Sequence, residues 1–320
     1  MISDIDHLLE ELRDETRTVS IACLYKLSGL DHEEIERFSA VWPQVPAIRR
    51  RKIVSHLVDI AEANFEADFD AVFRACFTDE DEFVRTQAIE GLWENEDIKL
   101  IRPLIAFLRD DPSVAVRAAA ATSLGRFVLL GELERLSPTL TNAVCEALWE
   151  IIHSFEEENI EVRRRAIESM AYSGEEAMAE VIADAYAGDR RMRVSAVFAM
   201  GRSADPRWRS IVLREITNPD PEMRYEAARA CGALEVEEAI PYLRNLVYDD
   251  DREIQEVSIW SLGQIGGEEA RRILEARYEE ADEILCEVIE DALGELALRG
   301  GEVDFLLFGL DANDWQGIDE

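Results

Sequence analysis

The stretch DDDREIQEVSIWSLGQIG at residues 249–266 decides the fold of this chain. Asp251, a residue type that caps helix starts, stands three residues before the apolar Ile254. Ser258 and Leu262 follow Ile254 at intervals of four residues, so that all three lie on one face of a helix. The stretch therefore predicts a helix that starts at an acidic turn and buries one apolar stripe.

The same pattern recurs along the chain at a nearly fixed period. Residues equivalent to Ile254, called anchor residues here, follow one another in steps of 32, 46, 30, 31, 31 and 31 residues. They are Val84, Val116, Val162, Met192, Met223, Ile254 and Leu285. The intervals between these helices hold further amphipathic segments, such as 98–108, 208–216 and 268–278. The period predicts stacked pairs, each made of a helix A, a short acidic turn and a helix B.

Each position around the anchor has a predicted structural task. The residues three before it are helix-capping types: Asp81, Ser113, Asn159, Asp189, Asp220, Asp251 and Asp282. The residues four after it are small, which lets neighbouring helices approach: Ala88, Ala120, Ala166, Ala196, Ala227 and Ser258. Ile289 breaks that rule in the last pair. Gly263, Gly266 and Gly267 are interpreted as helix ends.

An arginine directly follows the anchor in five of the repeats. These residues are Arg85, Arg117, Arg163, Arg193 and Arg224, and Gln255 and Cys286 end the row. One interpretation is a structural ladder in which each arginine pairs with an acidic group of its own or the next repeat. The alternative is a basic strip that contacts a ligand. The acidic caps that share the first helical turn favour the ladder.

The regularity of the repeat divides the chain into segments. Residues 1–78 are expected to form degenerate, capping helix pairs, and residues 79–299 form the regular repeats with a longer connection near 127–139. Residues 300–320 form an acidic and aromatic tail. We expect one continuous domain of about nine helix pairs, because a fixed period continues through the well-patterned part.

Segments such as PEMRYEAARACGAL (221–234) and DPSVAVRAAAATSLGRF (111–127) resemble HEAT repeats. Within that group they are most similar to the short HEAT-like repeats also found in phycobilisome (bilin) lyase subunits. The resemblance implies an all-α fold, a right-handed alpha-solenoid whose B helices line the inner face. It does not imply one function, since such proteins serve as scaffolds, as lyase or chaperone-like subunits and occasionally as enzymes.

Composition and motifs exclude several classes of function. The net charge of −35 makes free nucleic acid a poor partner and disfavours anionic membranes. No run of apolar residues is long enough for a membrane span. The four histidines stand apart from the five scattered cysteines, and no phosphate-binding or nucleophile motif is present. We therefore expect a cytoplasmic protein without catalytic residues, cofactor or metal ion.

Acidic residues gather in the A-to-B turns, which lie along one edge of a solenoid. We call this surface the turn edge. Its candidate partner-binding residues are Asp79, Glu80, Glu82, Asp249, Asp250, Glu279 and Glu280. A basic protein surface is the natural partner for such charges, although a solvated edge that complements helix dipoles is the alternative. In the tail, Phe305, Phe308 and Trp315 could dock on a partner or could cap the last helix pair.

These observations favour a non-enzymatic scaffold or assembly factor that binds a protein partner. The alternative, which rests on the resemblance alone, is a subunit of a bilin or tetrapyrrole lyase or isomerase. The sequence names neither the partner nor the oligomeric state.

Overall fold

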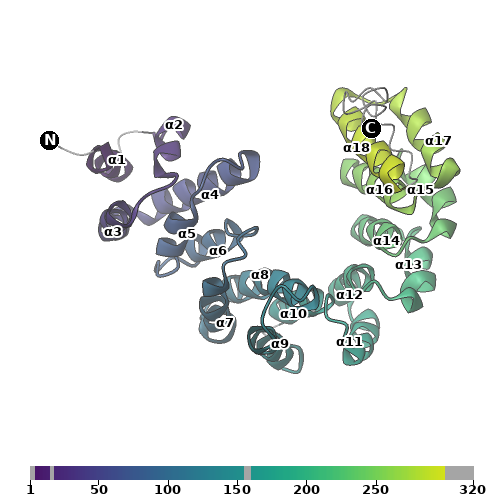
Figure 1. Cartoon of the computed structure of the whole chain (residues 1–320), viewed down its shortest axis with the longest axis horizontal. Helices are drawn as coiled ribbons and strands as arrows, with labels where there is room; N and C mark the ends of the chain where they lie inside the picture. The colour runs from purple at the N-terminus through teal and green to yellow at the C-terminus, as the bar shows by residue number, and fades with distance from the viewer. Residues whose placement is uncertain (1–3, 15–17, 155–159, 300–320) are drawn as a thin grey trace, which may run out of the picture. The chain divides into compact units, whose positions relative to one another are not determined.

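The computed structural model of the chain describes residues 4–14, 18–154 and 160–299. Within these ranges every regular element is a helix, as the sequence predicts (Figure 1). The chain divides into two compact units, Met1–Gly174 (unit 1) and Glu175–Glu320 (unit 2). This division differs from the segments at 78/79 and 299/300, which are defined by repeat regularity and stay predictions. Phe305, Phe308 and Trp315 lie outside the described residues.

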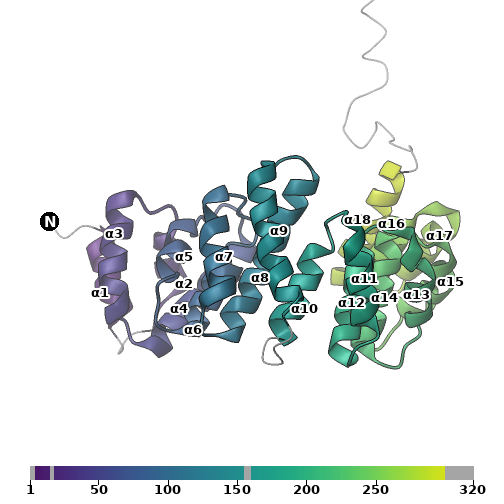
Figure 2. The same ribbon diagram turned by 90° about the horizontal axis from the view of Figure 1, so that it is seen from below.

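Unit 1 consists of helices that alternate between two layers. Its α-helices are α1 (Asp4–Arg13), α2 (Ile21–Leu24), α3 (His32–Val41), α4 (Ala47–Ala63), α5 (Asp70–Cys76), α6 (Glu82–Glu90), α7 (Ile101–Asp110), α8 (Val114–Glu132), α9 (Pro138–Ile152) and α10 (Ile160–Met170). Short 3-10 turns lie at Tyr25–Leu27, Trp42–Gln44 and Ile98–Leu100. The B helices α4, α6, α8 and α10 pack on one another in order, while α7 packs on both α8 and α9 (Figure 2).

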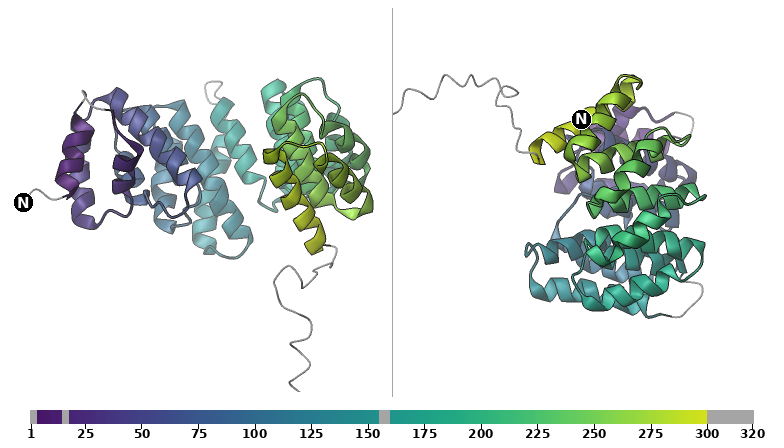
Figure 3. Two further views of the ribbon diagram at one scale, coloured as in Figure 1. Left: turned by 90° about the horizontal axis from the view of Figure 1, so that it is seen from above. Right: turned by 90° about the vertical axis from the view of Figure 1, so that its right-hand side faces the viewer.

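Unit 2 repeats the arrangement with greater regularity. Its α-helices are α11 (Glu176–Tyr186), α12 (Arg190–Arg202), α13 (Arg209–Glu215), α14 (Pro221–Ala233), α15 (Ile240–Leu246), α16 (Arg252–Ile265), α17 (Gly267–Tyr278) and α18 (Glu283–Arg299). Two 3-10 turns, Pro206–Trp208 and Glu237–Ala239, lead into α13 and α15. One layer consists of the B helices α12, α14, α16 and α18. A second layer, which packs against the first, consists of the A helices α11, α13, α15 and α17 (Figures 1 and 3).

The repeat pattern accounts for the helix starts and the core. The side chains of Asp81, Asp189, Asp220 and Asp251 each accept a hydrogen bond from the first turn of the following helix. Ser113 holds the cap position, but its side chain makes no such bond. Every anchor residue except the half-buried Met192 is buried, and the small residues four positions later are fully buried.

Glycines inside the B helices allow successive repeats to touch. A Cβ atom on Gly232 would lie 2.7–2.9 Å from atoms of Ser261, and one on Gly201 would lie 2.8 Å from Ala230 Cα. Gly263 stands in the same relation to the next repeat, with Ala292 Cα 3.0 Å away. The interpretation of Gly263 as a helix end is therefore wrong, because it lies within α16 and its task is close packing. Gly266 does end α16, with a φ of +75°.

The expected long connection near 127–139 is largely helix. Helix α8 continues to Glu132 and α9 begins at Pro138, so that only residues 133–137 connect them. The continuation is favourable because Phe127, Val128 and Leu130 are buried. By length and composition α8 is the one helix of the described residues that could span a membrane. It packs on α6, α7, α9 and α10 and buries side chains such as Val116, Leu124 and Phe127, as expected for a core helix.

The first repeats depart more from the sequence prediction. Helix α5, for example, begins only at Asp70. A loop of six residues, 64–69, precedes it and leaves Phe65 79% exposed. Similarly, the segment 18–27 forms only the single helical turn Ile21–Leu24, followed by a 3-10 turn.

Candidate functional site

At the turn edge, two of the arginines that follow an anchor residue link their repeat to the next. Arg85 donates from Nε and Nη2 to the carboxylate of Asp111, both at 2.9 Å, and from Nη1 to the carbonyl oxygen of Asp79 at 2.7 Å. Arg224 makes the same two kinds of contact in unit 2, with the Asp249 carboxylate at 3.2 and 3.3 Å and the Asn218 carbonyl oxygen at 3.1 Å. Each arginine thus closes its own turn and holds the following one.

The carboxylate that receives the arginine has a fixed place, two residues before the helix cap. There Asp79, Asp111 and Asp249 each accept a hydrogen bond from the backbone amide of the cap residue, at 2.8–3.0 Å. Asn218 occupies the equivalent position before α14 and accepts the same bond at 3.0 Å. A single side chain therefore shapes its own turn and, when it is a carboxylate, also binds an arginine.

The most buried of these links was not recognised in the sequence. Arg50, in the degenerate part of the chain, is 3% exposed. Its Nε lies 3.0 Å from Asp79 Oδ2, and its Nη2 donates to Asp79 Oδ1 at 3.1 Å and to Glu80 at 3.0 Å. Trp42 Nε1 also donates to Asp79, at 2.7 Å. The one available signal was the spacing of 29 residues to Asp79, close to the 26 that separate Arg85 from Asp111.

A second row of arginines binds the helix caps of the next repeat. Arg51 donates to Asp81 at 2.8 Å, Arg190 to Asp220 at 2.8 Å, and Arg252 to Asp282 at 2.9 and 3.0 Å. In each pair the partner stands 30 residues further along the chain. The caps thus neutralise arginines and satisfy helix amides at the same time.

The other arginines of the predicted ladder make different contacts. Arg193 Nη2 lies 3.6 Å from Glu215 and its guanidinium stacks on Tyr186, because the next repeat has Asn218 instead of a carboxylate. Arg117 donates to the Asp111 carbonyl oxygen at 2.7 Å. Arg163 Nε is buried without a hydrogen-bond partner in the structure. The turn that precedes it, residues 155–159, lies outside the described residues.

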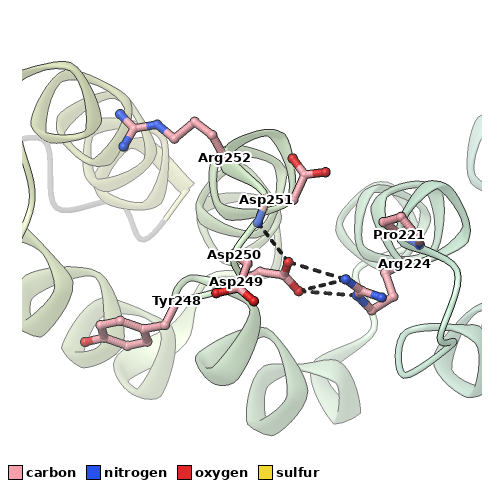
Figure 4. A pocket seen from close by; sticks show the side chains of 7 residues that line it. All are labelled: Pro221, Arg224, Tyr248, Asp249, Asp250, Asp251 and Arg252. Carbon is pink, nitrogen blue, oxygen red and sulfur yellow. Dashed lines mark hydrogen bonds and ion pairs between the residues drawn. The ribbon is translucent and has the colours of Figure 1, made fainter.

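These links leave a shallow depression between successive turns. In unit 2 a depression of about 730 Å³ is lined by Arg224, Tyr248, Asp249, Asp250 and Arg252, together with Pro221 and Asp251 (Figure 4). Unit 1 has one of about 360 Å³ at the equivalent place in the repeat, between residues 80–85 and 112–113. The depression is thus a feature of the repeat, and its polar lining suits contact with a charged surface.

The structure separates the predicted acidic candidates into two groups. Asp79, with a side chain 2% exposed, and Asp249, at 12%, are held by arginines and present little surface to a partner. Glu80 is bound to Arg50 but remains 84% exposed. The remaining candidates are exposed, and no ion pair is recorded for them among the described residues: Glu82, Asp250, Glu279 and Glu280.

Glu280 is exposed for an identifiable reason. It stands five residues before the anchor Leu285, as Asp249 stands five before Ile254. The preceding repeat would supply an arginine, but the residue there is Gln255, which instead donates to the Asp249 carbonyl oxygen at 2.6 Å. The last described turn therefore keeps an exposed carboxylate at the position where Asp79, Asp111 and Asp249 each bind an arginine.

Three of the cysteines, Cys23, Cys76 and Cys231, are buried. Burial raises the pKa of Cys23 to about 11 and that of Cys231 to about 12, and it also raises the pKa of Cys76. Such thiols are protonated at neutral pH and are poor nucleophiles. Among residues 4–14, 18–154 and 160–299, no three His, Cys, Asp or Glu side chains are grouped to hold a metal ion.

The links between caps and arginines predict a pH dependence of stability. The hydrogen bond from Arg190 holds the pKa of Asp220 below its ordinary value. A carboxyl group whose pKa is lowered by folding stabilises the protein above its unfolded pKa, and this contribution disappears as the pH falls through the folded pKa. We expect Asp220→Asn, which keeps the cap, to lose about 0.5–1 kcal/mol at pH 7, a small value because Arg190 is largely exposed to solvent.

The measurement is urea unfolding of the wild type and of Asp220→Asn from pH 7 to pH 3. The difference between them should shrink below about pH 4, where free aspartate protonates. Asp250→Asn removes an equal charge with no ion pair and serves as the control. A difference that stays constant over the whole pH range would contradict the assignment.

The fold and the linked turns together define an α-helical repeat protein with a polar, partly acidic edge. The family model of HEAT repeats matches residues 69–154, 181–256 and 210–294, more than half of the 320 residues. The chain therefore belongs to the HEAT-repeat family. Among curated proteins, no significantly similar relative is found.

Several solved structures are similar to the chain over most of its length. Escherichia coli YibA is 15% identical, with a TM-score of 0.45, and the match covers 88% of this chain and 99% of that one. Human deoxyhypusine hydroxylase, in complex with glycerol, is 18% identical with a TM-score of 0.36, covering 82% and 96%. The CpcE–CpcF complex of the phycocyanin lyase from Nostoc is 15% identical with a TM-score of 0.48, covering 71% and 93%. The family assignment rests on the family model alone.

Proposed function

We propose that this chain is a non-enzymatic scaffold that binds a basic protein partner through its turn edge. The observation that supports the proposal most directly is the turn 279–280, together with Asp250 in the turn before it. All three carboxylates are exposed, while the arginines nearby are engaged between repeats. Because these three carboxylates do not hold repeats together, they are available to bind a basic partner.

Electrostatics supports the same partner chemistry. The chain carries 69 acidic and 34 basic residues, and many of the arginines at the turns are neutralised by contacts within the protein. Each of these contacts neutralises a carboxylate together with its arginine, so the negative field of the turn edge comes from the exposed carboxylates that remain, such as Asp250, Glu279 and Glu280. Such a field accelerates encounter with a basic surface and repels an acidic one.

A triple variant of unit 2 tests the proposal. Asp250→Asn, Glu279→Gln and Glu280→Gln together remove three charges from the turn edge and no ion pair recorded among the described residues. Three exposed contacts of about 0.5 kcal/mol each would weaken a partner about tenfold. The measurement is affinity capture from the native organism with mass spectrometry at rising salt, where capture should also decline as the charges are screened.

The matched control removes three charges from a different surface. Glu238→Gln, Glu268→Gln and Glu275→Gln neutralise exposed residues at α15 and along α17. We expect this control to retain the captured partner. Equal capture by both triple variants, or capture that does not respond to salt, would refute binding through the turn edge.

The tetrapyrrole alternative rests on resemblance, and we do not propose it. Co-expression with a bilin and an acceptor protein would detect such an activity by a change in absorbance.

A further inference from the structure

A small cavity opens in unit 1 between the end of α4, the loop 64–69 and the segment after α6. Its volume is about 240 Å³. Apolar side chains line it together with polar groups of Asp68, Asp70, Glu94 and Asn95, and the apolar ones include Ala61, Phe65, Phe69, Phe73, Leu92 and Trp93. Pockets for small organic ligands typically measure about 300–1,000 Å³. The cavity is therefore of a size for a single large side chain rather than for a metabolite.

The cavity exists because the B helix of this repeat is short. Helix α6 ends at Glu90, whereas α12 and α14 continue for 13 residues each. Beyond Glu90 the chain tightens, with the Trp93 amide donating to the Glu90 carbonyl oxygen and the Asn95 amide to that of Leu92, both at 3.0 Å. The ring of Phe73 lies against the backbone of Gly91, where any added Cβ would be 2.4–2.7 Å from ring atoms. The floor of the cavity is thus fixed by close packing.

Two exposed aromatic residues stand at the cavity. Phe65 is 79% exposed, more than any other large apolar residue described, and Trp93 is 52% exposed. Trp93 replaces the glycine that other repeats have nine residues after the anchor, so it is not needed for stacking. Aromatic side chains around an apolar hollow are typical of the centres of protein interfaces.

The rim of the cavity is acidic. Asp68 is exposed and its Oδ1 accepts the Asp70 amide at 3.0 Å, and Glu94 is also an exposed residue of the lining. Burial, and next the charge of Asp68, raise the pKa of Asp70 above its ordinary value, although the hydrogen bond from Asn95 and the charge of Arg74 act in the opposite direction. The charge of Arg126 also acts on Asp70, so a further cation at this rim would chiefly neutralise the exposed Asp68 and Glu94.

From this arrangement we infer that the cavity is a docking site for a protein segment that presents one large apolar side chain beside a lysine or arginine. The apolar side chain enters between Phe65 and Trp93 and contacts Phe73, and the basic side chain lies over Asp68 and Asp70. The occupant must carry both features, because apolar side chains and carboxylates line the same cavity. This site is separate from the turn edge and does not depend on the proposed function.

The test uses the full-length protein and three fluorescent peptides with identical Gly-Ser flanks and central sequences Lys-Leu-Lys, Lys-Ala-Lys and Glu-Leu-Glu. Fluorescence anisotropy is followed as protein is added into the millimolar range. We expect saturable binding of Lys-Leu-Lys only. Phe65→Ser should weaken it at least tenfold, and Asp68→Asn, which keeps the acceptor oxygen, about threefold.

Matched controls separate the cavity from general surface effects. Ile48→Ser removes an apolar side chain that is 72% exposed on α4, and Glu146→Gln removes an exposed carboxylate on α9. Neither should change binding. Failure of all three peptides, equal binding of Lys-Leu-Lys and Glu-Leu-Glu, or equal losses in Phe65→Ser and Ile48→Ser would overturn the inference. Displacement of the peptide by a synthetic segment 300–320 would overturn it in favour of the chain's own tail as occupant.

Discussion

Asp79→Ala is expected to destabilise unit 1 by about 3–5 kcal/mol, because removal of one partner leaves a buried charge uncompensated. Arg50 is 3% exposed, and its remaining contacts are backbone carbonyl oxygens, such as that of Val45 at 2.8 Å, and Glu80 at the surface. The substitution also removes the acceptor for Trp42 Nε1 and for the Asp81 amide. The Asp79 carboxylate thus accepts hydrogen bonds from three different residues, Arg50, Trp42 and Asp81.

The measurement is the urea midpoint of the transition that exposes Trp42, followed by fluorescence and circular dichroism. Asp250→Ala is the control, since it removes an exposed aspartate from the equivalent turn of unit 2 and should cost less than about 0.5 kcal/mol. Equal effects of the two substitutions would show that Asp79 is a surface residue in solution. In that case it would return to the set of partner-binding candidates.

Gly232→Ala should cost unit 2 about 2–3 kcal/mol, although alanine gains about 1 kcal/mol in intrinsic helix propensity. The new Cβ would lie 2.8 Å from Ser261 Cα and 2.9 Å from Ser261 Cβ. Because one of these atoms belongs to the backbone, no rotamer change relieves the overlap, and α14 must move away from α16. When the two helices move apart, the apolar contacts between α14 and α16 on either side of Gly232 are also weakened.

Gly294→Ala gives the opposite expectation at the equivalent position of the last repeat. Among the described residues, nothing outside the neighbouring backbone of its own helix lies within 4 Å of the Cβ that it would add, and the residue lies inside α18. We expect a gain of about 0.5–1 kcal/mol from helix propensity. Thermal unfolding followed by circular dichroism compares the two variants, and destabilisation by both would contradict the packing role of Gly232.

The fold could be predicted from the sequence largely because each helix carries its own start signal. The aspartate caps and the four-residue spacing of buried positions depend only on neighbours within one helix, so a single sequence shows them. The role of Gly263 could not be found in this way, since its contact, Ala292, belongs to another helix. The course of 127–139 was missed for a similar reason: tertiary burial of Phe127 and Leu130 continues a helix through Gly131.

The candidate site was predictable in position but not in detail. Glu82, Asp250, Glu279 and Glu280 are exposed at the turns, where the acidic runs placed them. In the sequence Asp79 could not be distinguished from the exposed acidic residues beside it. It differs from them because it binds the buried Arg50, which comes from a repeat without a regular pattern. The cavity beside Phe65 had no sequence signal, because it depends on where α6 stops.

The links between repeats recur at the same pair of positions from one repeat to the next. Gly201 meets Ala230 as Gly232 meets Ser261, and the link of Arg190 to Asp220 has the same 30-residue separation as that of Arg252 to Asp282. A gene duplication that inserted one 31-residue block within unit 2 would therefore reuse these contacts at its junctions wherever the block keeps the glycine, the arginine and the aspartate cap. Chains of this kind can thus change length by whole units during evolution while reusing the contacts that recur.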